Sequence, residues 1–333
     1  APARRLRQLA RRLAEPDIAD DGAAKRFDIA VTKFVYHSRQ GWTGAGEART
    51  NFGENTIALG LVSDGDELVE GFAGVRGRLE RQSIGSRRFR ASLAVDAFHQ
   101  TWDPATLTAA AASDQSGELY RSRVNVQPSF TIVLAEPLTL TFGASFQQLE
   151  PRFSEARTLS ANLATGTLRF HKGWQDAAST NHSLDAGYSV RAGTSLLGSD
   201  YSYTRHYGDV RYAAVNGRHG LTVDFGAGGL NGRAPMYDRF ILGNASTLRG
   251  WNKFDLAPLG ADREVHGSVD YRYRIFTVFY DTGVVWTGTS SAGPKQSAGA
   301  GLRADGREGF LVAVAFPFRS GHFDPMFIVG FNF

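Results

Sequence analysis

The sequence predicts an all-β fold, a transmembrane antiparallel β-barrel of about 16 strands. Counting the alternating segments gives about fifteen or sixteen, and bacterial single-chain barrels favour even strand numbers. From residue 27 onward, apolar and polar residues alternate with the period of two that is typical of strands. The alternating segments are on the order of ten residues long, which is the length that a tilted membrane strand needs. The polar face carries charges and many small residues, as a barrel lumen does. A soluble sandwich shares the alternation, but strand length and lumen composition favour the barrel.

Composition excludes several classes of function. The 333 residues include no Cys, which excludes a disulfide framework, Cys-ligated zinc and thiol catalysis. The formal net charge of +4 is small for this length and does not indicate nucleic acid as a partner. No segment approaches the roughly 18 consecutive apolar residues of a membrane-spanning helix. A closed barrel is the other structure that satisfies its backbone in lipid.

Residues 1–26 differ from the rest of the chain and form the first predicted region, ahead of a barrel over residues 27–333. Leu6, Leu9 and Leu13 recur at helical spacing among five arginines, and Pro16 ends the pattern. We expect a short basic amphipathic helix there. It is a solvated helix, a helix on an anionic membrane surface, or a plug in the barrel lumen.

The strand pattern is clearest in three places. In residues 138–147, Leu138, Phe142 and Phe146 share one face, and residues 265–274 and 310–318 alternate in the same way. Short turns at 83–88 and 304–309 contrast with longer connections at 103–118 and 286–297, which predicts short turns at one end of the barrel. Aromatic residues near strand ends are expected to form interfacial girdles; they are Trp102, Trp174, Tyr201, Tyr203 and Trp286.

One connection is too long for an ordinary hairpin. FILGNASTLRGWNKFDLAPL, residues 240–259, contains the sequence Leu248, Arg249, Gly250 and Trp251. One strand later, the alternation in residues 275–286 puts Asp281 on the lumen face. A carboxylate on an inner wall is best partnered by an arginine fork. Arg249 is the natural candidate, which predicts a loop that folds back into the barrel.

These motifs resemble the BamA/TamA-type outer-membrane surface-antigen superfamily, which also contains the two-partner-secretion transporters. The resemblance rests on LRGW in the loop, on Phe279, Asp281 and Gly283 of FYDTG, and on the terminal FIVGFNF. It is closest over residues 218–333. It implies that Arg249 docks on Asp281 and that Asp270 stands where relatives often carry another acid. The chain end, through Phe327, Val329, Gly330, Phe331 and Phe333, then serves as a recognition signal for the outer-membrane assembly machinery.

The resemblance implies a barrel in the bacterial outer membrane that inserts or translocates proteins, with membrane lipids and unfolded or nascent polypeptides as partners. It implies no enzymatic activity, cofactor or metal. The seam strands, near Phe27 to Ser38 and Phe327 to Phe333, would open laterally for a client strand. Relatives usually carry POTRA domains before the barrel, whereas about 26 residues precede the first strand here, so substrate recognition is not carried over. The alternatives are a passive pore and a membrane anchor for another domain.

Overall fold

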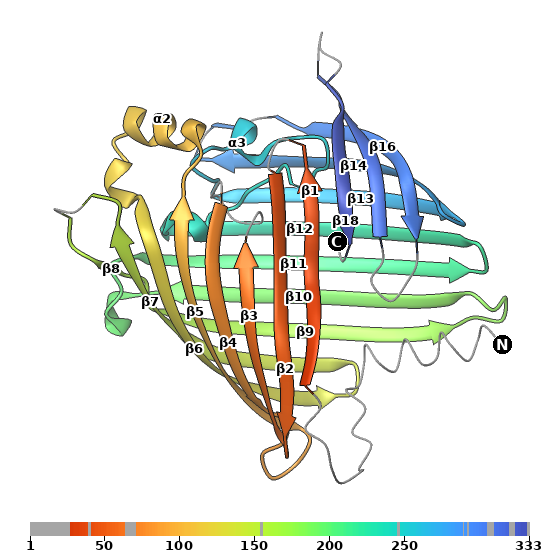
Figure 1. Cartoon of the computed structure of the whole chain (residues 1–333), viewed down its shortest axis with the longest axis horizontal. Helices are drawn as coiled ribbons and strands as arrows, with labels where there is room; N and C mark the ends of the chain where they lie inside the picture. Colours follow the sequence, from red (N-terminus) through yellow and green to blue (C-terminus); the bar gives the residue numbers. More distant parts are fainter. Residues whose placement is uncertain are drawn as a thin grey trace.

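The computed structural model describes residues 27–38, 41–63, 71–153, 156–244, 247–288, 290–291, 293–304, 310–319 and 324–331. The predicted helix over residues 1–26 lies outside them. Two α-helices, three 3-10 turns and eighteen strands make up this part of the chain (Figure 1). The strands are β1 Phe27–His37, β2 Gly41–Phe52, β3 Asn55–Ser63, β4 Gly71–Arg81, β5 Phe89–Thr101, β6 Tyr120–Ala135, β7 Leu138–Pro151, β8 Leu159–Ser160, β9 Leu163–Gln175, β10 Asn181–Gly193, β11 Ser202–Asn216, β12 His219–Arg233, β13 Arg263–Tyr273, β14 Phe276–Thr287, β15 Ser290–Ser291, β16 Lys295–Ala304, β17 Phe310–Pro317 and β18 Met326–Phe331. The helices are α2 Pro104–Ala112 and α3 Lys253–Leu256, and the 3-10 turns are η1 Ser116–Glu118, η2 Ser195–Leu197 and η3 Met236–Asp238.

All strands belong to one antiparallel sheet that closes on itself, because β1 pairs with β18 as well as with β2. Two of the eighteen strands, β8 and β15, have two residues each, which leaves sixteen long strands in the wall. The predicted barrel of about 16 strands is therefore confirmed. None of the helices in the described ranges is long and apolar enough to cross a membrane.

Alternation sorts side chains between the outside and the lumen. On β14, Phe276 is 60% exposed and Val278 52%, whereas Phe279 is 4% exposed and Asp281 is fully buried. Large apolar side chains of the other strands are exposed outward in the same way, for example Leu61, Phe142 and Phe327. An exposed apolar band around a closed barrel is the surface that a membrane covers.

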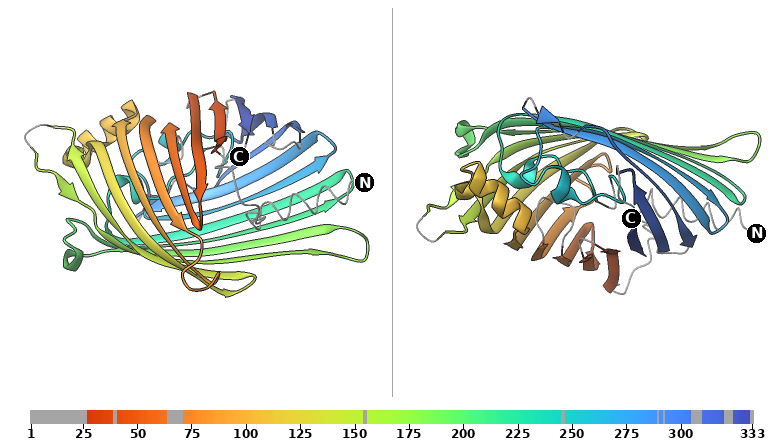
Figure 2. Two further views of the ribbon diagram at one scale, coloured as in Figure 1. Left: turned by 60° about the horizontal axis from the view of Figure 1, so that its bottom comes forward. Right: turned by 90° about the horizontal axis from the view of Figure 1, so that it is seen from above.

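The two ends of the barrel differ as the sequence predicts. At one end the strands join through tight turns, at 53–54, 136–137, 217–218 and 274–275. At the other end lie the long connections, including the one between β5 and β6 that contains α2, and the one over residues 234–262 between β12 and β13. The latter, with α3, lies inside the ring of strands (Figure 2).

Two expectations are wrong in detail. Trp102, Tyr201 and Tyr203 are each at most 5% exposed, so they are not girdle residues. The Trp102 indole donates to the carbonyl of Tyr120 at 2.7 Å, and Tyr203 faces the lumen. The expected loop at 103–118 contains the helix α2, which Asp103 caps by accepting from the Ala105 amide at 2.7 Å.

Candidate functional site

The guanidinium of Arg249 lies between two wall carboxylates. Its Nε and Nη2 donate to Asp281 at 2.8 and 2.5 Å, and its Nη1 and Nη2 donate to Asp270 at 2.7 and 3.1 Å. The Arg249 backbone amide adds a third bond to Asp281, at 3.0 Å. The Asp281 side chain is 1% exposed and that of Arg249 is 11% exposed. The three side chains form a largely dry, charge-assisted cluster. We call it the Arg249 lock.

The wall is shaped to receive this arginine. The Arg249 guanidinium carbon lies 3.7 Å from the centre of the Phe279 ring, which is close cation–π stacking. Gly299 makes room for that ring, since a Cβ there would come within 2.2 Å of Phe279. Gly283 likewise lets Leu242 of the loop pack on β14, because its Cβ would lie 3.0 Å from Leu242. The phenylalanine and glycine of FYDTG therefore have packing roles beside the acid.

Local hydrogen bonds and apolar packing fold the loop inside the lumen. Phe240 and Ala261 bond to each other in both directions, at 2.9 and 2.8 Å, and join the two ends of the loop. Asn244 accepts from the backbone and hydroxyl of Thr247, and Asn252 caps α3. Leu248 is fully buried and Trp251 is 6% exposed, with its indole donating to the carbonyl of Gln296 at 2.9 Å.

Gly250 is the conformational requirement of the motif. Its φ is +90°, and a Cβ there would lie 3.2 Å from the Cβ of Ala315 on β17. Gly250→Ala is expected to destabilise the docked loop by roughly 1–3 kcal/mol, the cost of holding a side chain in that region. The measurement is the urea midpoint of the detergent-solubilised barrel. Gly173→Ala on β9, whose new Cβ would only touch a carbonyl at 3.7 Å, is the control and should leave the midpoint unchanged.

A second anchor at the base of the loop was not predicted from the sequence. Asp238 forms an ion pair with Arg191 of β10 and accepts from the hydroxyl of Tyr203 on β11. Its neighbour Arg239 donates to Gln115 and Glu118, both at 3.0 Å, in the connection that follows α2. The adjacent charges of Asp238 and Arg239 are the sequence signal for this anchor. It does not identify their partners, which lie 35 to 124 positions away in the sequence.

The helix α2 covers the loop at the long-loop end. Thr106 of α2 donates to the carbonyl of Pro258 at 2.7 Å, and Figure 2 shows α2 beside the segment that contains α3. Thr106, Gln115 and Glu118 all belong to the connection between β5 and β6. Their contacts with Pro258 and Arg239 therefore join this connection to both ends of the loop over residues 234–262. The sequence marks this segment only by its Pro and Ala content, which is compatible with a helix.

An apolar cluster connects the lock with the barrel seam. It comprises Val35, Phe279, Leu311, Ala313, Ala315 and Ile328, and each is at most 5% exposed. Val35 lies on β1 and Ile328 on β18, so the cluster crosses the seam. Phe279, which carries the Arg249 guanidinium on its ring, is a member of the same cluster. We call it the seam cluster.

The predicted terminal signal lies on the last strand. Phe327 is 52% exposed toward the outside, while Val329 and Gly330 pair with Tyr36 and Val35 across the seam. Phe331 pairs through its backbone with Phe34 and with Phe310, and Phe333 lies outside the described residues. Among the residues that the structure describes, no group of His, Asp or Glu has the arrangement of a metal site.

Comparison with known proteins agrees with the barrel fold. Residues 79–333 match the Omp85 superfamily domain. Among solved structures, BamA from Haemophilus ducreyi lacking POTRA domains 1–3 is similar, with a TM-score of 0.66 and 13% identity over 92% of this chain and 70% of that one. CdiB from Acinetobacter baumannii has a TM-score of 0.57 and 13% identity, over 92% of this chain and 59% of that one.

CdiB from Escherichia coli has a TM-score of 0.56 and 11% identity, over 93% of this chain and 68% of that one. At these identities the likeness establishes a shared fold, and the chain spans less than two thirds of the Acinetobacter protein. No curated protein matches the sequence significantly.

Proposed function

The chain belongs to the Omp85 superfamily, and from this premise we propose that its outer-membrane barrel inserts proteins into the membrane by opening between β1 and β18. One observation carries the proposal. Among the described residues, β1 pairs with β18 at four positions, Phe34–Phe331 to His37–Ile328, and with β2 at ten, from Phe27 to His37. Fewer ladder bonds make this junction less costly to separate than the junction between β1 and β2.

The unpaired side of β1 offers an edge for a client strand. In the described part of the chain, residues Phe27–Ala30 pair with β2 alone. Phe27 is 66% exposed and Ile29 73% exposed, and they face outward into the membrane. A strand edge with apolar side chains beside it is a template for pairing with another extended chain. An unfolded membrane strand satisfies its backbone by adding to this edge.

The Arg249 lock acts as a brace for the seam in this proposal. Arg249 stacks on Phe279, and the seam cluster packs Phe279 with Val35 and Ile328. The loop therefore biases the position of both seam strands through contiguous packing rather than over a distance. Release of the lock is expected to loosen the seam, and a rigid lock to hold it closed.

Secretion of an unfolded polypeptide through the lumen is the second candidate. It is supported by the loop over residues 234–262 and by α2, which stand across the lumen at the long-loop end (Figure 2). Such barrels keep short turns in the periplasm and long loops outside the cell. In this candidate the loop and α2 are an external plug that must move for a polypeptide to pass. An occupied lumen also argues against a passive pore, which needs an open one.

The test uses the full chain reconstituted into lipid vesicles. An unfolded outer-membrane β-barrel is added, and the rate at which it folds into the vesicle membrane is followed. We expect vesicles with the protein to accelerate folding over protein-free vesicles. Equal rates would contradict insertion. An unfolded secreted polypeptide, scored by protection from external protease inside the vesicle, tests the second candidate in the same preparation.

A further inference from the structure

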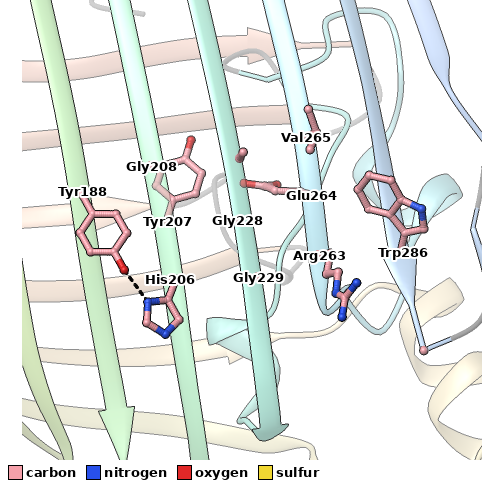
Figure 3. A pocket seen from close by; sticks show the side chains of 12 residues that line it. Tyr188, His206, Tyr207, Gly208, Gly228, Gly229, Arg263, Glu264, Val265 and Trp286 are labelled. Carbon is pink, nitrogen blue, oxygen red and sulfur yellow. Dashed lines mark hydrogen bonds between the residues drawn. The ribbon is translucent and has the colours of Figure 1, made fainter.

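A hollow on the outer surface of the barrel is not explained by insertion or secretion. It has a volume of about 570 Å³ and lies over β10 to β14 (Figure 3). The hollow exists because its floor is made of residues with little or no side chain. These are Gly208, Ala227 and Gly229, which occupy outward-facing positions. Its rim carries Tyr188, His206, Arg263 and Trp286. These rim residues lie on the outward face of their strands, whereas Tyr207 and Glu264, which also line the hollow, alternate with them and lie on the lumen face.

Strand register arranges these residues in two rows across the sheet. In the first row His206, Gly229, Arg263 and Trp286 are direct partners on β11, β12, β13 and β14. In the second row Tyr188, Gly208, Ala227 and Val265 are direct partners on β10 to β13. With about 4.8 Å between strands, His206 and Arg263 stand about 10 Å apart on either side of Gly229. The first row is therefore polar at both sides of a gap, and the second is apolar.

The first row lies at the level of the membrane interface. Arg263 is the first residue of β13 and Trp286 the last but one of β14, both at the long-loop end. Trp is enriched at the interface between hydrocarbon and headgroups. Since long loops lie outside the cell, this row meets the headgroups of the outer leaflet. The second row is two residues further along the strands, about 7 Å deeper toward the hydrocarbon.

Arg263 indicates the charge of the occupant. It is exposed on the outer wall, and no carboxylate among the described residues forms an ion pair with it. An arginine on the lipid-facing wall costs free energy unless an anion or water meets it. His206 faces the same gap and is held by a hydrogen bond to the Tyr188 hydroxyl at 2.6 Å. A lipid phosphate is the anion that a membrane supplies at this depth.

We propose that this hollow binds a phosphate-bearing lipid of the outer leaflet, of the lipid A type. Its phosphate lies between Arg263 and His206, and one acyl chain lies on the small residues of the second row. A second outward hollow, of about 380 Å³ over β3 to β5, makes the contrast. It is lined by Leu59, Leu61, Val75 and Val95, and its one arginine, Arg76, pairs with Asp96 of the lumen wall. That hollow has no cation for a headgroup.

The experiment measures binding of purified bisphosphorylated lipid A to the detergent-solubilised full chain by native mass spectrometry. The probes for comparison are dephosphorylated lipid A and phosphatidylglycerol. We expect one lipid A to bind at least tenfold more tightly than dephosphorylated lipid A, because the phosphate contact is charge-assisted. It should also bind more tightly than phosphatidylglycerol, because a phosphate monoester carries more charge and more free oxygens than a phosphodiester. Arg263→Gln is expected to remove that preference. Gly229→Leu, whose Cβ meets nothing within 4 Å, fills the hollow and should weaken lipid A binding about tenfold.

Gly77→Leu is the matched control. Gly77 also points outward from a strand, and its new Cβ would make only ordinary contacts, at 3.6 Å with Leu59, but it fills the second hollow. It should leave lipid A binding unchanged. Mobility of unheated samples on gels confirms that each variant is a folded barrel. Equal binding of the three lipids, an unaltered Arg263→Gln variant, or an equal loss in Gly77→Leu would each overturn the proposal.

Discussion

A disulfide between cysteines introduced at Tyr36 and Val329 is expected to abolish client insertion while leaving a folded barrel. The two residues are direct partners on β1 and β18, so the bond joins the strands that the proposal requires to separate. The chain has no Cys of its own, so the two new thiols have no competing partner. A covalent bond cannot be opened by a client strand, and insertion in the vesicle assay should fall to the protein-free rate. Reduction should restore it.

The matched control joins the same strand to its other neighbour. Cysteines at Ile29 and Ala48, which are partners on β1 and β2, form a bond within a hairpin that stays intact in every version of the mechanism. That variant should insert clients at the normal rate under oxidising conditions. Undiminished insertion by the oxidised Tyr36–Val329 variant would exclude lateral opening. If that variant still translocated a secreted polypeptide into the vesicle lumen, the result would favour secretion, the second candidate function.

Much of the wall could be predicted because a strand has a fixed period. Alternation alone assigns Asp281 of β14 to the lumen face, and in the structure Asp281 is buried there, whereas Phe276 and Val278 are exposed on the outside. Once the facing of Asp281 was known, the need of a buried carboxylate for a donor pointed to Arg249, the arginine in the longest loop. The structure brings the two together and adds Asp270 to the same guanidinium. A period of two is visible within a single strand, so the face that a side chain takes can be predicted without knowing which distant residues lie beside it.

What could not be predicted depends on residues that are distant in the sequence. The Asp238 anchor needs Arg191 and Tyr203, which come from two other strands. Alternation reports which face a side chain takes, but not whether a loop fills the space beside it. For that reason Tyr203 was assigned to an interfacial girdle, although it lies against the loop base in the lumen. For the same reason α2 was not predicted, since it packs on the in-folded loop, where Thr106 donates to the carbonyl of Pro258.

Arg249→Ala is expected to have the largest effect of any single substitution in the loop. It leaves Asp281, which is fully buried, without its charge partner and without two of its three hydrogen bonds from Arg249. Breaking a buried ion pair by removing one member costs about 3–5 kcal/mol. The loop should therefore leave the wall. The measurements are protease cleavage within residues 234–262 and single-channel conductance, and both should increase.

Two comparisons separate loss of the lock from loss of any lumen charge. Arg169→Ala removes an arginine that pairs with Asp209 at 2.9 Å, but these side chains are 57% and 30% exposed. A pair so exposed contributes about 0–1 kcal/mol, so cleavage and conductance should stay at the level of the unaltered protein.

Asp281→Asn added to Arg249→Ala removes the stranded charge and should recover part of the lost stability, since the penalty comes from an unpaired buried carboxylate. Equal effects of Arg249→Ala and Arg169→Ala, or additive effects of Arg249→Ala and Asp281→Asn, would show that the lock does not hold the loop. In that case, the short seam alone would have to account for opening. A coupled result instead makes release of Arg249 an energetic step that precedes separation of β1 from β18, because Phe279 packs against both the guanidinium and the seam cluster.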